Sequence, residues 1–107
     1  MKTKTFDEIV SLVKAERVRQ DEKWGTQRHP YGTSLEYLPL ANDAREICDY
    51  QMKSGKVTWA DILNEEYYEA LSETDSVKFF EEAVQNAAVW FCVMEQLLEE
   101  KENANNL

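Results

Sequence analysis

The last third of the chain constrains the fold most, because residues 76–101 carry apolar side chains at helical spacing and contain neither glycine nor proline. We predict one long helix over this range, with Asp75 or Ser76 as its N-cap. Over residues 83–94 the helix is apolar nearly all round, which is typical of a helix enclosed on every side. We therefore predict a homo-oligomer, either a dimer or a dimer of dimers, in which two chains share this helix. The alternative is a central helix that its own three neighbours cover.

Three further helical segments precede this helix and are separated by short breaks. We predict them over residues 5–24, 39–53 and 58–73. Thr5 with Glu8, and Thr58 with Asp61, have the spacing of N-terminal capping pairs. Strand-like runs of alternating β-branched residues are missing, and three glycines and two prolines are few. The sequence thus predicts an all-α fold, a single four-helix bundle-like domain over residues 1–107 with a disordered or frayed tail at about 102–107.

The charge of the chain bears on the class of partner. A formal net charge of −9 argues against a nucleic-acid polymer, because phosphate backbones attract a positive surface. The charge is uneven: residues 1–30 hold seven Lys or Arg and five Asp or Glu, a net of +2, whereas residues 31–107 hold five and sixteen, a net of −11. This division suits a small anion bound together with a metal cation. Ordinary surface charge is the alternative.

The lengths of the apolar runs and the spacing of the cysteines indicate the cellular compartment of the protein. No apolar run approaches the roughly 20 residues that span a bilayer, and the start MKTKTFDEIV has no apolar signal-peptide core. We therefore expect no membrane partner and a cytoplasmic location. Cys48 and Cys92 lie in helical segments without the spacing of metal ligands. We interpret both as small buried side chains in a reducing compartment, not as a disulfide.

Carboxylates interrupt the apolar side of the third segment, in ILNEEYYEAL at residues 62–71. Glu65 and Glu69 are four residues apart and Glu66 and Glu69 are three apart, so they share one surface of a helix. Glu66 and Glu69 also fall within or beside the apolar sector that contains Ile62. Buried unpaired carboxylates are costly, and a divalent cation offsets this cost because Mg²⁺ prefers carboxylate oxygens. A solvated acidic face is the alternative.

Two other segments also carry polar residues where apolar residues belong. In the last segment Glu82 lies on the same side as Asn86, so a neighbouring helix would present another carboxylate to the same ion. In the first segment the apolar stripe continues into Glu16, Arg17 and Gln20. Polar positions on three helices predict a charged, hydrated pocket inside the bundle, where glutamates from adjacent helices bind a cation.

Three stretches, in this order, carry a resemblance to a known family: ERVRQDEKWGTQRHP, TWADILNEEYYEAL and FFEEAVQNAAVWFCVMEQL. They resemble the short MazG-like proteins of bacteria and phages, which belong to the all-α nucleotide pyrophosphohydrolase superfamily. The resemblance covers residues from about 16 to 98, and the combination is more specific than any single stretch. It implies a MazG-like helical domain that hydrolyses (d)NTPs between the α- and β-phosphates, giving monophosphate and pyrophosphate, with Mg²⁺ or Mn²⁺.

The same resemblance implies a set of metal ligands. The family motif is EExxE followed, after a dozen or more residues, by ExxD. Glu65, Glu66 and Glu69 match its first half and Glu82 begins its second, but Gln85 stands in place of the aspartate. We expect these five residues to bind metal, and Glu66 or Glu69 to orient or deprotonate the attacking water.

The glutamine leaves other functions open. An amide oxygen is a weaker and neutral ligand, so one alternative is a protein on the same scaffold that binds or sequesters nucleotides without hydrolysis. A second alternative is a helical interaction module without any ligand, motivated by the acidic surface and the apolar last helix. Base preference, sugar preference and physiological role leave no mark on the sequence.

Candidates for binding the substrate lie around the end of the first segment. They are Glu16, Arg17, Gln20, Lys23, Trp24, Arg28 and His29. The three basic residues are candidates for phosphate oxygens, and Trp24 for stacking on a base. Each has a structural alternative: Arg17 paired with a glutamate, Lys23 solvated, Trp24 in the core, or His29 only shaping its loop.

Overall fold

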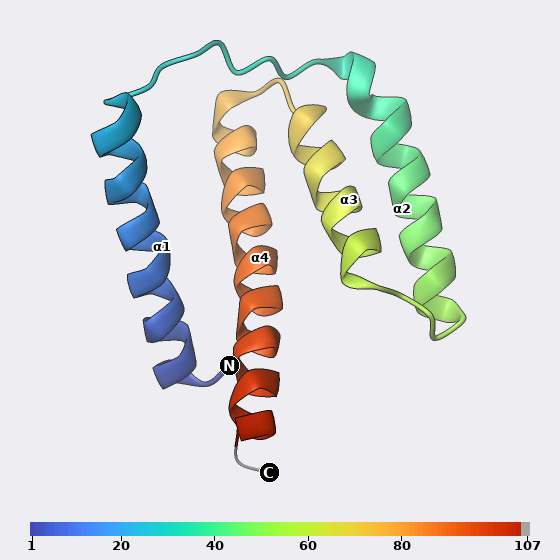
Figure 1. The fold of residues 1–107 in the computed structure, drawn as a ribbon. Coiled ribbons are helices and arrows are strands. Elements are labelled where there is room, and N and C mark those ends of the chain that lie inside the picture. The colour runs from blue at the N-terminus through green and yellow to red at the C-terminus, as the bar shows by residue number, and fades with distance from the viewer. Residues whose placement is uncertain (106–107) are drawn as a thin grey trace. The chain divides into compact units, whose positions relative to one another are not determined.

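The computed structural model describes residues 1–105, which form four α-helices and one short 3-10 helix and contain no strand (Figure 1). The elements are α1 (Thr3–Trp24), η1 (Leu35–Tyr37), α2 (Leu38–Lys53), α3 (Trp59–Leu71) and α4 (Ser76–Asn105). The prediction of an all-α fold with four helices is confirmed, and the helices are consistent with a helical bundle. Among the described helices, none has the length and hydrophobicity needed to cross a membrane.

The chain divides into two compact units. The first unit comprises residues 1–30 and 91–107, and therefore α1 and the C-terminal part of α4. In this unit the Phe6 and Phe91 rings lie 5.5 Å apart between centroids, and the Lys2 ammonium lies 3.8 Å from a Glu99 carboxylate oxygen. The Ile9 side chain is buried in the core of this unit, with only 2% of its surface exposed.

The start of α1 differs from the prediction. The helix begins at Thr3, and the backbone N–H of Phe6 donates a hydrogen bond to the Lys2 carbonyl at 3.0 Å. Thr5 therefore lies inside the first turn, where its side chain is buried, and it cannot act as an N-cap, which needs an extended backbone. The predicted capping pair of Thr5 and Glu8 is wrong. Gly25, with φ of 70°, ends the helix as expected.

The second unit comprises residues 31–90, and its helices α2 and α3 run antiparallel and side by side (Figure 1). Small buried residues on α2, namely Ala41, Ala44 and Cys48, recur at helical spacing and allow a close approach of α3. The predicted capping box is confirmed, because Asp61 N–H donates to Thr58 Oγ1 and Thr58 N–H donates to Asp61 Oδ2. The helix α3 ends at Leu71, two residues before the expected end.

The helix α4 starts where the sequence predicts and ends later. The Asp75 carboxylate accepts a hydrogen bond from Lys78 N–H at 2.9 Å, as an N-cap does. The helix continues to Asn105, so residues 102–105 of the expected tail are helical. Residues 106–107 lie outside the described residues. A polar sequence continues a helix readily when it contains neither glycine nor proline.

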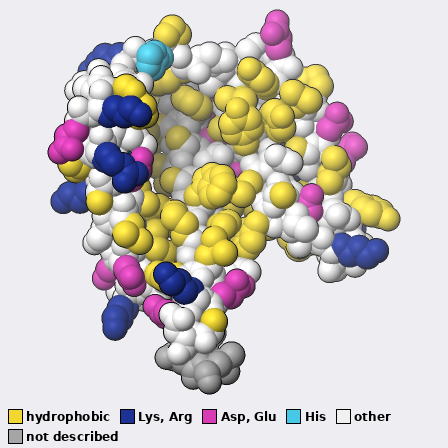
Figure 2. Space-filling model, in the orientation of Figure 1, with side chains coloured by type: hydrophobic (Ala, Val, Ile, Leu, Met, Phe, Trp, Pro, Cys, Tyr) yellow, Lys and Arg dark blue, Asp and Glu magenta, His cyan; other side chains and the backbone are white. Residues whose placement is uncertain are grey.

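The apolar side chains of α4 are incompletely covered within the chain. Figure 2 shows hydrophobic side chains along the viewed side of α4, and exposed fractions reach 67% for Val77, 54% for Val84 and 52% for Trp90. Cys48 is buried as predicted, but Cys92 of α4 is exposed, which corrects that prediction; both thiols are free.

Candidate metal centre

Three of the predicted metal ligands converge in the second unit. Glu66 and Glu69 of α3 and Glu82 of α4 are half-buried, and one carboxylate oxygen from each lies within 4.8 Å of the other two. Two oxygens bound to one Mg²⁺ ion are at most about 4.2 Å apart, twice the metal–oxygen distance. Small side-chain rotations therefore give these carboxylates the spacing of a shared cation, and their chemistry fits one.

Two of the three carboxylates, those of Glu66 and Glu82, lie in an unfavourable electrostatic environment. Burial, followed by the charges of Glu69, Glu82 and Glu65, raises the pKa of Glu66. Burial likewise raises the pKa of Glu82, with a further contribution from Glu69. One oxygen of Glu66 and one of Glu82, Oε2 in each case, are buried without a hydrogen-bond partner. Such groups favour either a proton or a bound cation.

An arginine that the sequence analysis missed stands beside this cluster. The Arg45 guanidinium of α2 donates a hydrogen bond to Glu69 Oε1 at 3.3 Å. The side chains are 50% and 21% exposed respectively, so the pair sits at the rim of the cluster. Arg45 lies four residues after Ala41 and three before Cys48, both on the buried side of α2. That spacing was the available signal, because it directs Arg45 towards α3.

A second missed residue links the two helices that carry the carboxylates. The side-chain amide of Asn86 donates to the backbone carbonyl oxygen of Glu66 at 2.9 Å and to that of Glu82 at 2.8 Å. Both acceptors belong to residues of the cluster. The polar Asn86 within an apolar stretch of α4 was its signal in the sequence.

The other two predicted metal ligands, Glu65 and Gln85, lie outside this group of three carboxylates. The Glu65 carboxylate accepts a hydrogen bond from the Cys48 thiol of α2, and it does not belong to the group of three. Burial, and then this hydrogen bond, raises the pKa of Cys48 to about 12. Gln85, one turn beyond Glu82 on α4, is exposed.

The predicted substrate-binding residues all belong to the first unit, where several bind one another. Arg17 donates to Gln20 at 3.0 Å and pairs with Asp21 at 3.2 Å, and Gln20 donates to Glu16 at 3.1 Å. Glu16 also pairs with Arg19. Glu16 and Gln20 are half-buried, but Arg17 is 61% exposed. The Arg17 guanidinium is solvated and paired along its own helix with Asp21, and its role in substrate binding stays a prediction.

The remaining candidates lie at the end of α1 and in the following loop. Trp24 is 57% exposed, which excludes the alternative that it belongs to the core, and the Lys23 ammonium lies 4.7 Å from its ring centroid. Arg28 is exposed, and a ring nitrogen of His29 is hydrogen-bonded to Gln27 at 3.1 Å. These loop residues line a shallow pocket that includes Trp24.

Comparison with known proteins gives no match: no family model, no curated protein and no solved structure matches the chain.

Proposed function

We propose that the chain is a metal-dependent nucleoside triphosphate pyrophosphohydrolase, as its resemblance to the MazG-like family implies. The observation that carries this proposal is the convergence of Glu66, Glu69 and Glu82, whose ligand oxygens lie within 4.8 Å of one another on two adjacent helices. Glu66 and Glu69 belong to the EExxE motif, and Glu82 begins the second half of the motif that carries the resemblance to the family. Buried carboxylate oxygens without partners support a divalent cation, Mg²⁺ or Mn²⁺.

The proposed reaction is the attack of water on the α-phosphorus of a (d)NTP. The bond from the α-phosphorus to the bridging oxygen breaks, pyrophosphate leaves, and the water oxygen remains on the monophosphate. A bound Mg²⁺ neutralises phosphate charge and lowers the pKa of water. In this proposal Glu66 and Glu82 hold the cation, and Glu69 or Glu66 orients the water and accepts its proton. The roles predicted for residues of the first unit, with Arg17, Lys23 and Arg28 at phosphate oxygens and Trp24 stacked on a base, stay predictions.

The test is a direct assay of pyrophosphate release. Purified protein with Mg²⁺ and a panel of NTPs and dNTPs should release pyrophosphate, and Glu66→Gln should abolish the release. Glu46→Gln is the matched control, because Glu46 is an exposed glutamate of α2 outside the cluster. The proposal fails if all nucleotides stay intact at high protein concentration.

A second candidate is a protein that binds nucleotides without hydrolysing them. The observation that favours it is Gln85, a neutral and exposed residue where the family motif has an aspartate. Calorimetry that detects tight Mg²⁺-dependent nucleotide binding without turnover would select this candidate over the enzyme.

We also propose that the chain forms a homo-oligomer through α4. An exposed apolar stripe on this helix supports the proposal: Val77, Val84 and Ala88 are spaced by seven and four residues and so lie on one side. An apolar stripe of this kind is typical of a helix that packs against a second helix. A second copy of the chain is the partner that symmetric association supplies most simply.

A further inference from the structure

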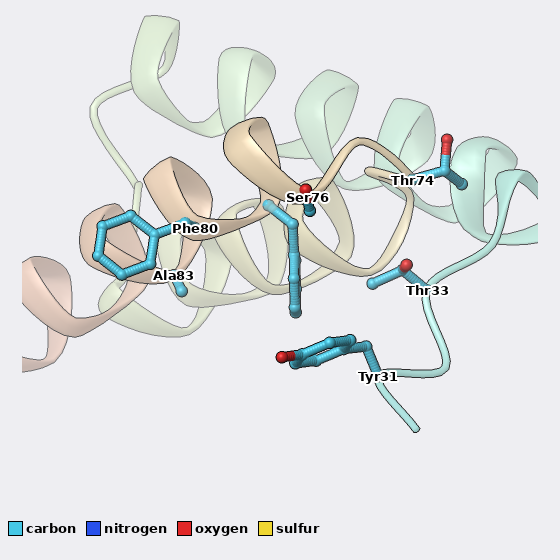
Figure 3. Close-up of a pocket in the computed structure, with 7 residues that line it drawn as sticks. Tyr31, Thr33, Thr74, Ser76, Phe80 and Ala83 are labelled. Atoms are coloured by element: carbon cyan, nitrogen blue, oxygen red, sulfur yellow. The ribbon is translucent and has the colours of Figure 1, made fainter. Parts of the chain in front are cut away.

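A second pocket lies in the second unit, at the start of α4. Its volume is about 310 Å³. Its apolar lining consists of Ala83 and three aromatic side chains, those of Tyr31, Phe79 and Phe80. Its other lining side chains carry hydroxyl groups and are those of Thr33, Thr74 and Ser76. Figure 3 shows Phe80 and Ala83 at one end of the pocket and Thr33 and Thr74 at the other, with Tyr31 below them.

The walls of this pocket are held in place by contacts within the unit. The backbone N–H of Ser34 donates a hydrogen bond to the Leu71 carbonyl at 2.9 Å, which fixes the loop that carries Tyr31 and Thr33. The Tyr31 ring meets the Phe79 ring edge-on, with centroids 5.7 Å apart. The pocket is therefore a formed feature with an ordered aromatic wall.

Within a single chain, its aromatic side chains are nevertheless open to a ligand. Tyr31 is 81% exposed and Phe80 is 70% exposed. Large aromatic side chains that stay exposed beside hydroxyl groups are suited to a planar, polar-edged ring, because the ring faces stack and its edges take hydrogen bonds.

We propose that this pocket binds the base of the nucleotide, a proposal that rests on the function proposed above. Glu82 of the carboxylate cluster follows Phe79 by three residues, so these two half-buried side chains lie on the same side of α4 and one turn of the helix carries both sites. On a helix of this geometry such positions are within about 10 Å of each other, which a nucleotide spans from base to phosphate. The base then stacks on the aromatic wall while the phosphates meet the carboxylate-held cation.

The chemistry of the pocket also predicts how selective it is. A hydroxyl group both donates and accepts hydrogen bonds, so Thr33, Thr74 and Ser76 can bind either a donor or an acceptor on the edge of a base. Stacking is tolerant of base identity as well. We therefore infer that discrimination among the bases is weak.

The test uses nucleosides, which lack phosphates and need no metal. Deoxyadenosine, deoxyguanosine, deoxycytidine and thymidine are titrated into the metal-free full-length chain and followed by NMR, with ribose 5-phosphate as the probe without a base. The nucleosides should shift the ring signals of Tyr31, Phe79 and Phe80, and the sugar phosphate should not. Phe80→Ala should weaken nucleoside binding by about tenfold, the typical loss when one stacking partner is removed. Tyr50→Ala is the matched control, because Tyr50 is a 71% exposed aromatic residue of α2 outside the pocket.

The outcomes separate this proposal from the proposed function. If pyrophosphate is released but Phe80→Ala changes neither nucleoside binding nor KM, the base lies elsewhere and the pocket proposal is overturned. Shifts confined to Trp24 overturn it too, as does a loss of self-association in Phe80→Ala with unchanged nucleoside binding. If nucleosides bind in the pocket without any hydrolysis, the pocket proposal holds and the enzyme proposal fails.

Discussion

Asn86 of α4 donates a hydrogen bond from its side-chain amide to the backbone carbonyl of Glu66 in α3, at 2.9 Å. The same amide donates to the Glu82 carbonyl at 2.8 Å. One polar side chain therefore joins the backbones of two residues whose carboxylates converge. This amide bridges α3 and α4 at the cluster.

Replacing Asn86 should destabilise the protein and loosen the cluster. Asn86→Ala removes two partly buried hydrogen bonds, each worth about 0.5–1.5 kcal/mol, so the free energy of unfolding should fall by about 1–3 kcal/mol. Urea denaturation measures the loss. Asn42→Ala, at an exposed position of α2, carries the same change in helix propensity, so the difference between the variants isolates the hydrogen bonds. Equal effects of the two substitutions would contradict this interpretation.

Neutralising a carboxylate of the cluster should stabilise the metal-free protein. Glu82→Gln removes the cost of burying a charged carboxylate, and then its repulsion by Glu69, and leaves a neutral side chain of similar shape, so the free energy of unfolding at pH 7 should rise by about 1 kcal/mol. The same variant should lose most of the increase in melting temperature that millimolar Mg²⁺ gives the parent protein. Thermal melts with Mg²⁺ or with EDTA measure both effects, with Glu46→Gln as the control. A Mg²⁺ response that survives in Glu82→Gln would remove this residue from the ligand set.

The stability of the metal-free protein should depend on pH through Glu66 and Glu82. Their pKa values in the folded protein lie above the ordinary value of 4.5, so protonation favours the folded state. This stabilisation is fully present below pH 4.5 and is lost as the pH rises through the raised pKa values. The double variant Glu66→Gln, Glu82→Gln should therefore exceed the parent in melting temperature at pH 7 to 8, with the difference shrinking towards pH 4.5. A difference that is constant with pH would exclude these two carboxylates as its source.

Removing Arg45 should strengthen cation binding at the cluster. The Arg45 guanidinium pairs with Glu69 at 3.3 Å and so competes with a metal for this carboxylate. In Arg45→Gln the free energy of unfolding should fall by less than about 1 kcal/mol, because the pair is partly exposed. The affinity for Mg²⁺, measured by calorimetry, should rise. Arg19→Gln removes an arginine that pairs with a glutamate on its own helix, and it serves as the control. Weaker Mg²⁺ binding in Arg45→Gln would mean that the guanidinium supports the site instead of competing for it.

A charge on the exposed stripe of α4 should break the proposed oligomer. Sedimentation equilibrium should give the parent protein a mass that is a multiple of 12.5 kDa. In Val84→Glu, placed where the side chain is 54% exposed, the mass should fall to that of one chain because a buried carboxylate opposes association. Tyr50→Glu, on the exposed surface of α2, should leave the mass unchanged. A parent protein that is already monomeric would exclude the oligomer.

Interactions between residues close together in the sequence were sufficient to predict the helices and part of the candidate site. The end of α1 at Gly25, the capping box of Thr58 and Asp61, and the cap of α4 at Asp75 each depend on residues within four positions, which a sequence displays directly. The spacing of Glu66 and Glu69 on one side of α3 is of the same kind. Thr5 was misread because the same residue type serves as a cap or as a buried side chain, and only packing distinguishes the two.

The amino-acid sequence by itself determined the four helices, their breaks and the unusual acidic side of α3, because these follow from interactions along one helix. Only the tertiary structure decided how closely Glu82 approaches Glu66 and Glu69, that Arg45 of α2 pairs with Glu69, and that Tyr31 and Phe79 share a pocket wall. The physical reason is that helical periodicity gives the direction of each side chain around its own axis. The register and separation of neighbouring helices, which place side chains from distant residues within bonding distance, follow from packing across the whole unit.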